Sequence, residues 1–424
     1  MSPDSLIANA LAQSPPDKPV WVALSGGLDS CLLLTLAARA AHRFPRPVYA
    51  VHVNHGLQSA AIDFEWHCRR LCGRLGVPLF VEQVQVDARG QGIEAAARET
   101  RYAAFVRRVR EGESLWLAQH ADDQAETLLL AALRGSGVRG LAGMPSVREW
   151  QGRCVMRPLL ERSRSELEGV ARKLDIDWIE DPTNADIDLD RNFLRHRVMP
   201  LLTSRWSQAL RSLAQSAHLA GEADELLDEL AALDLAAAGG EPHRLRIEAL
   251  RTLSAPRQRL LIRHACQRLE LPTPPAARLA TLLEQLDARD GAQVRVVWPG
   301  AEARCWRDRL YLQAPMSELP AHWQCDWDGR PGLMTPVGRI EQGLFPSNGA
   351  PGAALRLTLR RGGESLRVAG RGRRDVKRLL QEAAIPPWQR SRQLLAWHEG
   401  VLVAVLGVAV AQGWRQTGQA SVVS

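Results

Sequence analysis

The stretch Ser25-Gly26-Gly27-Leu28-Asp29-Ser30 decides how the first part of this 424-residue chain folds. It follows an apolar run at residues 20–24 that predicts a buried strand, and it precedes a segment at 32–41 whose spacing predicts a helix. Two adjacent glycines let a ligand approach the backbone, and the N–H groups at a helix start attract anions. The hydroxyls of Ser25 and Ser30 add donors for phosphate oxygens, so the turn is typical of a phosphate-binding loop.

Asp29 decides which kind of phosphate ligand we expect. A carboxylate beside a polyphosphate is repelled unless a cation lies between them, and Mg²⁺ prefers oxygen ligands of this type. The sequence therefore predicts a site for a metal-bound nucleoside triphosphate, in which Asp29 is a metal ligand. The alternative is an ordinary glycine turn capped by Ser and Asp. No Lys follows the glycines, so the loop is not of the G-x-x-x-x-G-K-[ST] type.

Strands and helices alternate over the residues that follow. This alternation predicts an α/β fold with a doubly wound parallel sheet, in the strand order 3-2-1-4-5. Ligands bind such sheets where the strand order reverses, so residues 25–30 and 120–127 should face each other across strands one and four. The expected later strands are residues 48–54, 79–86, 115–119 and 154–159, and the expected helices are 62–75, 93–110 and 124–133.

Three acids stand together after the fourth strand. Asp123 and Glu126 are three residues apart at a helix start, so both should point to one face, and Asp122 is expected at the cap. Acids at a helix start also complement the helix dipole without any further role. We expect these carboxylates either to hold Mg²⁺, with Asp122 joining Asp29 as a metal ligand, or to recognise an ammonium group.

Other polar groups lie near the predicted crevice. His52 and Asn54 end the second strand and are expected to hydrogen bond to the nucleotide or to a loop. Arg191 and Arg195 share a helix face, and the alternatives there are contact with phosphates or a solvated basic face. The glycine-rich segment 134–144 is expected to bring backbone and Arg side chains to phosphates.

The rest of the chain predicts two further domains. We expect a catalytic domain at residues 1–215, a mostly helical middle domain at 216–315 and a small α+β domain at 354–424. Residues 201–235 predict one or two helices, followed by a linker at 236–242. Further helices are expected at 247–270 and 276–286. Short strands are expected at 293–298, 303–306, 310–313, 355–359, 394–397 and 401–406.

The charge distribution favours a nucleic-acid partner. The net charge is +7, which permits but does not require a polyanion. Basic residues crowd a glycine-rich C-terminal segment, where phosphate-backbone contact is expected. They are Arg356, Arg360, Arg361, Arg367, Arg371, Arg373, Arg374, Lys377 and Arg378.

Composition also bears on the compartment. No apolar run reaches about 18 residues, and the first residues lack the pattern of a signal peptide, so no membrane segment is expected. The seven cysteines are an odd number and form no C-x-x-C pair. Reduced thiols in a cytoplasmic protein are the simplest account.

Residues 25–30 resemble the S-G-G-x-D-S signature of PP-loop ATP pyrophosphatases, which cleave ATP between the α and β phosphates. A wider set of segments resembles the bacterial tRNA(Ile)-lysidine synthetase family over most of the first 200 residues. Gln58 and Gln119 depart from the family pattern. The matching segments are residues 25–30, 52–57, Glu94, Arg98, Arg101, Tyr102, 121–127, 134–144, 157–160 and 181–195, with fainter matches at Lys377, 385–390 and 400–407.

The resemblance implies a fold like that of the adenine nucleotide alpha hydrolases and a two-step ligation. The wobble cytidine of tRNA(Ile) attacks the α-phosphate of ATP and releases pyrophosphate. The ε-amine of free L-lysine then displaces AMP to form lysidine. The anticodon loop and body of the tRNA are the implied partners, and a homodimer is also considered.

The resemblance also assigns site residues. The catalytic set is Asp29, Asp123, Glu126, Arg191 and Arg195, and Asp123 and Glu126 would hold the lysine ammonium unless they bind Mg²⁺. Nucleotide binding falls to Ser25, Gly26, Gly27, Leu28, Asp29, Ser30, His52 and Asn54. Three alternatives remain: a PP-loop tRNA thiolase, disfavoured by the absence of C-x-x-C; an amidating enzyme acting on small molecules; and an RNA-binding protein that uses ATP without ligase chemistry.

Overall fold

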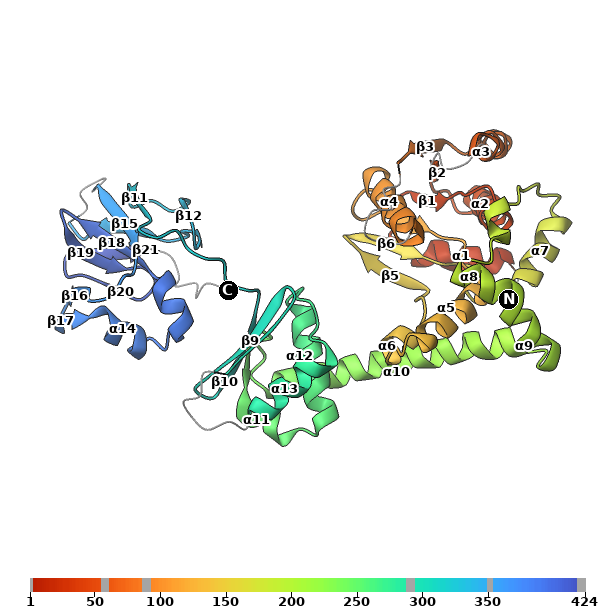
Figure 1. The fold of residues 1–424 in the computed structure, drawn as a ribbon. Coiled ribbons are helices and arrows are strands. Elements are labelled where there is room, and N and C mark those ends of the chain that lie inside the picture. The colour runs from red at the N-terminus through yellow and green to blue at the C-terminus, as the bar shows by residue number, and fades with distance from the viewer. Residues whose placement is uncertain (1–2, 55–60, 86–92, 287–293, 349–353, 418–424) are drawn as a thin grey trace. The chain divides into compact units, whose positions relative to one another are not determined.

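The computed structural model describes residues 3–54, 61–85, 93–286, 294–348 and 354–417. The chain divides into two compact units, Met1–Leu227 and Asp228–Ser424, which we describe separately (Figure 1). Parts of several predicted features lie outside the described residues. These are residues 1–2 of the first predicted domain, residues 55–58 after the second strand, the end of the third strand at Val86, the side chain of Glu94, residue 293 of a predicted strand and residues 418–424 of the last predicted domain.

The first unit is built on a six-stranded sheet in the order β3-β2-β1-β4-β6-β5. The predicted order 3-2-1-4-5 is confirmed for the five parallel strands, with β6 as the fifth. An antiparallel edge strand, β5, was not predicted because its four residues are half exposed and carry no apolar run. The strands are β1 Val20–Ala23, β2 Val48–Asn54, β3 Leu79–Gln83, β4 Ser114–Trp116, β5 Val147–Trp150 and β6 Arg153–Met156.

Helices cover both faces of this sheet (Figure 1). Successive residues of a strand point to opposite faces, so Trp21 packs into one core with Phe105 while Val20 and Val22 pack into the other. The larger core contains the buried leucines of α2, which explains the apolar run after the Gly-Gly turn. The helices are α1 Pro3–Gln13, α2 Leu28–Arg43, α3 Ala61–Leu75, α4 Ile93–Arg108, α5 Ala121–Leu133, α6 Val138–Leu141 and α7 Arg164–Lys173.

A helical segment closes the first unit. A short 3₁₀ turn, η1 Pro182–Ala185, precedes α8 Asp190–Phe193, which continues through a π-helical turn, η2 Leu194–Val198, into α9 Met199–Arg205. The long helix α10 Ala209–Ala237 follows, so residues 201–235 form two helices. The first two residues of the predicted linker belong to α10, and the chain turns at Gly239 and Gly240, both with positive φ.

The second unit begins with helices packed on an antiparallel sheet in the order β7-β10-β9-β8. The predicted short strands at 303–306 and 310–313 are confirmed and pair with each other in antiparallel fashion, and β7 adds the outer strand. The elements are β7 Arg244–Arg246, α11 Ile247–Thr252, α12 Ala255–Arg268, α13 Ala276–Leu286, β8 Arg295–Trp298, β9 Ala301–Trp306 and β10 Arg309–Gln313.

The last part of this unit holds a five-stranded sheet in the order β11-β15-β18-β19-β20. Strand β11 precedes Ala354, the predicted domain start, yet pairs with β15, so this sheet begins earlier in the chain than residue 354. The elements are β11 Gln324–Trp327, β12 Met334–Thr335, β13 Gly338–Arg339, β14 Gly343–Pro346, β15 Leu355–Leu359, β16 Ser365–Val368, β17 Gly372–Asp375, α14 Val376–Glu382, η3 Pro387–Arg392, β18 Leu394–His398, β19 Val401–Val405, β20 Ala409–Val410 and β21 Trp414–Thr417. Among the described residues, no helix is long and apolar enough to cross a membrane.

Candidate active site

The turn between β1 and α2 has the geometry that its glycines predict. Gly26 has φ +94°, and a Cβ there would lie 3.1 Å from Cδ1 of Phe64, so a side chain would be strained and crowded. Gly27 is the N-cap of α2, and no side chain caps this helix. The N–H groups of its first turn are therefore available to an anion.

The two serines hold the turn in shape. Ser30 Oγ accepts hydrogen bonds from the backbone N–H of Ser25 at 3.1 Å and of Gly26 at 3.3 Å, and it donates to the carbonyl of Gly27 at 3.0 Å. Ser25 Oγ lies 3.0 Å from Ser30 Oγ. These contacts preorganise the loop. Donation of the two hydroxyls to phosphate stays a prediction.

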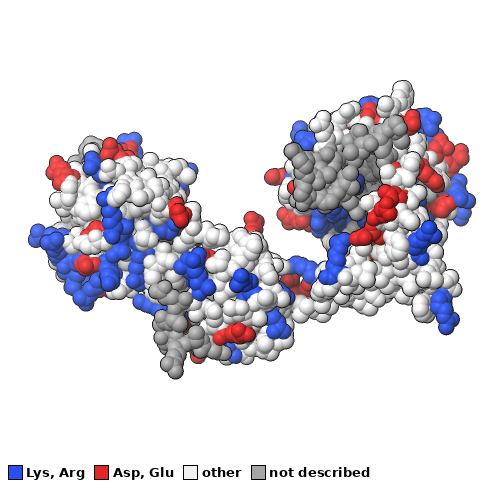
Figure 2. All heavy atoms as spheres, viewed as in Figure 1, with Lys and Arg blue, Asp and Glu red and all other residues white. Residues whose placement is uncertain are grey.

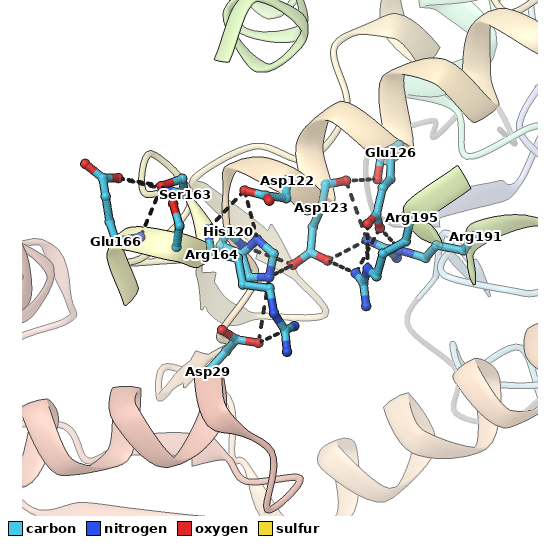
Figure 3. Close-up of polar contacts among 12 residues, drawn as sticks. Asp29, His120, Asp122, Asp123, Glu126, Ser163, Arg164, Glu166, Arg191 and Arg195 are labelled. Atoms are coloured by element: carbon cyan, nitrogen blue, oxygen red, sulfur yellow. Dashed lines mark hydrogen bonds and ion pairs between the residues drawn. The ribbon is translucent and has the colours of Figure 1, made fainter. Parts of the chain in front are cut away.

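The turn after β4 faces the glycine turn, as the predicted topology requires (Figure 3). His120 is the N-cap of α5, and its backbone N–H donates to Asp123 Oδ2 at 3.0 Å. Its ring Nε2 lies 3.7 Å from Asp29 Oδ2 and 3.5 Å from Asp123 Oδ2. The buried imidazole thus joins the aspartate of the first turn to the acids of the second.

Asp122 does not take the cap position that we predicted, because His120 occupies it. The Asp122 side chain instead accepts a hydrogen bond from the backbone N–H of Arg164 at 3.0 Å. It thereby fastens the start of α7 to the start of α5. The guanidinium Nη1 of Arg164 lies 3.6 Å from Oδ2 of Asp29.

Asp29 is the residue that best fits a metal ion. Burial raises the pKa of its carboxyl, against the opposing effects of His120 and Arg164. Its Oδ1 is buried and has no hydrogen-bond partner among the described residues. Those residues include no group of three or more His, Cys, Asp or Glu side chains placed to hold a metal. A Mg²⁺ ion with one carboxylate and several phosphate and water oxygens is consistent with this donor set.

Asp123 and Glu126 form a network with two arginines. Glu126, which is almost completely buried, accepts from Nε of Arg191 and Nε of Arg195, both at 2.7 Å. Asp123 Oδ1 lies 3.0 Å from Arg191 and 3.1 Å from Arg195 (Figure 3). The shared-face prediction for both the acids and the arginines is confirmed. Four of the five predicted catalytic residues therefore lie together. The arginines bind these acids, a partner that neither of the two alternatives from the sequence included.

The network governs the charge of its members. Burial alone would raise the pKa of Asp123, but His120, Arg191 and Arg195 hold it below its ordinary value. Burial opposes the charge of Arg195, yet Glu126 and Asp123 raise its pKa. The Asp123 carboxylate is therefore favoured in its ionised form and is largely neutralised by these neighbours. An ammonium group reaching them would join an existing set of charge-assisted hydrogen bonds.

His52 and Asn54 lie behind the loop. His52 is buried, with Nδ1 2.8 Å from the carbonyl of Leu24, the residue just before the glycine turn. Asn54 donates to Glu65 on α3 at 3.1 Å. Of the two roles expected for His52, the structure contains the contact with a loop. Their contact with a nucleotide stays a prediction.

The sequence analysis gave no role to three residues of the site, His120, Gln124 and Arg164, although it expected residues 120–127 to face the glycine turn. His120 could have been found from its place directly after the fourth predicted strand. Arg164 could have been found from the S-x-x-E pattern at Ser163 and Glu166, which predicts a helix start and forms a capping box at the start of α7. The side-chain amide of Gln124 makes two hydrogen bonds to the backbone of Met144, at 2.7 and 2.8 Å, which hold the end of the glycine-rich segment on α5.

Family comparisons cover all three parts of the chain. A PP-loop domain matches residues 4–202, a TilS substrate binding domain matches 245–311, and a TilS substrate C-terminal domain matches 355–424. The order of the three matches follows the order of the folded parts described above.

Relatives match over almost the whole length. A tRNA(Ile)-lysidine synthase of Pseudomonas aeruginosa is 42% identical, covering 94% of this chain and 91% of its own. A tRNA(Ile)-lysidine synthase of Xanthomonas axonopodis is 40% identical, covering 98% of this chain and 96% of its own. Among solved structures, the U34-tRNA thiolase NcsA from Methanococcus maripaludis aligns with TM-score 0.43 and 15% identity, over 51% of this chain and 76% of that one.

Proposed function

Because the chain belongs to the tRNA(Ile)-lysidine synthase family, we propose that it joins free L-lysine to C2 of the wobble cytidine of tRNA(Ile). ATP is the energy source, and AMP and pyrophosphate are the products. The observation that carries the proposal is the continuous contact from Asp29 through His120 to Asp123, which connects the phosphate-binding turn with the buried acid–arginine network.

In the first step, O2 of the cytosine attacks the α-phosphorus of ATP and the bond to the β-phosphate oxygen breaks. Pyrophosphate leaves, and the base carries AMP. The uncapped N–H groups of α2 and the Gly26–Gly27 turn would bind the departing phosphates. Asp29 would hold a Mg²⁺ ion, which neutralises phosphate charge when it is bound.

In the second step, the ε-amine of lysine attacks C2 and the C2–O bond to AMP breaks. We propose that Asp123 and Glu126 orient the ammonium end of lysine before it loses its proton. Ion pairs with Arg191 and Arg195 hold both carboxylates in a fixed position. Binding of Mg²⁺ by Asp122 is the weaker assignment, because that carboxylate already fastens α7.

Substrate RNA would be held by the basic C-terminal part. Figure 2 shows Lys and Arg side chains gathered on the visible face of the last part of the chain. Arg367, Arg373 and Lys377 form no ion pair among the described residues, so their charge is available for phosphates.

We propose the cytoplasm as the compartment of this protein. A homodimer stays a prediction, and measurement of the mass of the protein in solution tests it.

The cysteines argue against a thiolase. Burial raises the pKa of both Cys31 and Cys72 to about 12. Burial also raises the pKa of Cys68, which lies next to the glycine turn. Thiols with such pKa values carry almost no thiolate near neutral pH and are poor nucleophiles. Sulfur transfer through these residues is therefore disfavoured.

The test is incubation of the protein with ATP, Mg²⁺, total tRNA and one labelled amino acid at a time. Label from lysine alone, in one isoleucine tRNA species, with release of AMP and pyrophosphate, would support the proposal. Binding of tRNA without release of AMP would favour an ATP-dependent RNA-binding protein. Label from another amino acid would exclude lysine as the substrate.

A further inference from the structure

A cavity of about 470 Å³ lies in the second unit, and none of its lining residues belongs to the site described above. Its walls come from Arg304 of β9, the segment after β10, the end of β15 and η3. The volume is within the range of sites that hold one small ligand. We call it the arginine–tryptophan pocket, and its lining residues include Arg304, Arg360, Arg361, Arg392, Trp323 and Trp388.

The pocket carries an excess of positive charge. No Asp or Glu is among its lining residues. Arg304 is bound to Glu302 at 2.9 Å, and Arg360 lies 3.6 Å from Glu364. Arg361 and Arg392 form no ion pair with any described residue, and Nη1 of Arg392 donates only to a backbone carbonyl at 2.7 Å. Two lining arginines therefore have charge available for an anion.

Further arginines crowd the same region. The guanidinium of Arg307 lies 4.5 Å from the ring centre of Trp306, and that of Arg390 lies 5.9 Å from it. Burial lowers the pKa of Arg390, and the charges of Arg307 and Arg360 lower it further. Like charges gathered in this way favour a bound anion, because the anion relieves their repulsion.

The aromatic rings decide what kind of anion fits. Trp388 is half-buried and meets Tyr311 edge-on at 5.3 Å, and the guanidinium of Arg304 lies 5.2 Å from its ring centre. The indole N–H of Trp388 and Nε of Arg360 have no hydrogen-bond acceptor among the described residues. Indole rings beside arginines are typical of sites where unpaired bases stack and their phosphates are neutralised.

We propose that the arginine–tryptophan pocket binds one unpaired nucleotide of the tRNA substrate, with its base against the indoles and its phosphate at Arg361 and Arg392. The inference rests on the proposed function, since that function supplies the tRNA. A folded tRNA offers unpaired nucleotides in its loops and at its single-stranded 3′ end. The pocket is therefore a point of shape recognition distinct from contacts with the paired backbone.

The experiment measures binding of full-length tRNA(Ile) transcript by the whole protein across a salt series. We compare the wild type with R361Q/R392Q, with W323L, and with R330Q/R339Q as a control that removes the same charge from exposed arginines of the β11–β14 region. Thermal unfolding of each variant checks that it is folded.

We expect R361Q/R392Q to weaken binding by about tenfold and to reduce the salt slope by about 0.7–1.4, as for one or two phosphates of a single strand. W323L should weaken binding by about fivefold or more with an unchanged slope, because it removes stacking rather than charge. Chemical probing should show one unpaired nucleotide losing protection in both variants. A transcript trimmed of its 3′ single strand distinguishes that end from a loop.

Affinities and salt slopes equal to those of the control would overturn the proposal. So would binding of free AMP at the pocket without any change in tRNA binding, since the site would then serve a free nucleotide. Lysine incorporation at saturating tRNA should be the same in the variants and the wild type. An absence of lysine incorporation by the wild type would contradict the proposed function and leave the tRNA-binding comparison readable.

Discussion

Two sets of arginines in this protein differ in their ion pairs. Arg191 and Arg195 in the first unit form ion pairs with Asp123 and Glu126, so their charge is neutralised within the protein. Arg361 and Arg392 in the second unit have no carboxylate partner among the described residues. The difference shows that an arginine can be assigned to phosphate binding only when the structure shows that no carboxylate of the protein neutralises it.

The largest effect is expected where the first unit meets the nucleotide. Asp29→Ala removes the carboxylate with an unpartnered oxygen at the glycine turn, and with it the proposed contact with Mg²⁺. Pyrophosphate release should fall by at least about 10³-fold, while tRNA affinity stays close to that of the wild type. A pyrophosphate assay and a tRNA-binding titration on the same sample check both. Weakened tRNA binding with normal turnover at saturating tRNA would contradict the assignment.

The next largest effect tests whether the paired arginines depend on their acids. Glu126→Gln leaves two partly buried guanidinium groups short of one charge partner. The free energy of unfolding should fall by about 3–5 kcal/mol, measured by denaturant titration. Glu168→Gln is the matched control, because Glu168 pairs with Arg172 on the exposed face of α7. That change should cost at most about 1 kcal/mol. Equal losses in the two variants would show that the buried network adds no special stability.

Glu302 extends the comparison to a paired acid of the second unit. It is fully buried; burial would raise its pKa, but hydrogen bonds from Arg304, Arg295 and Gln313 hold the pKa below its ordinary value of 4.5. A carboxyl whose pKa is lower in the folded protein stabilises the fold above the unfolded pKa. That contribution should be lost as pH falls below about 4.5.

The measurement is the free energy of unfolding between pH 6 and pH 3.5. Glu302→Gln should be less stable than the wild type at pH 6, and its stability should depend less on pH in the acid range. An identical pH dependence in the two proteins would mean that other carboxylates account for the acid sensitivity.

The smallest effect is expected from exposed arginines. Replacing Arg371, Arg373 and Arg374 by Ala removes three charges near β17, of which Arg371 is partly neutralised by Glu382. Binding of tRNA should weaken by about tenfold, and its salt dependence should flatten. Arg39→Ala/Arg43→Ala/Arg172→Ala, on α2 and α7, is a control with the same loss of charge. The same salt slope in both triple variants would place the RNA surface elsewhere.

Local patterns were enough to predict much of the first unit. The apolar run before Ser25 predicts β1, and the alternation of strands and helices predicts the strand order around it. The spacing of Asp123 and Glu126 predicts that both point to one side of α5. Each of these inferences depends on residues close together in the chain. By contrast, the edge strand β5 has only four half-exposed residues, and its pattern is too weak to be recognised.

The partners of charged groups could not be predicted in this way. Arg191 binds Glu126 across 65 residues of chain, and His120 approaches Asp29 only because β1 and β4 are neighbours in the sheet. The fit of a ligand in the arginine–tryptophan pocket likewise depends on four segments separated in sequence. No spacing rule covers such distances.

The sequence by itself determined the glycine turn, the parallel sheet that presents it and the family to which the chain is similar, because backbone geometry and strand periodicity are local properties. Only the tertiary structure decided which arginines neutralise acids and which have charge available for RNA. Charge pairing and burial arise when distant segments pack together, and they set both the pKa of a carboxyl and the availability of a guanidinium.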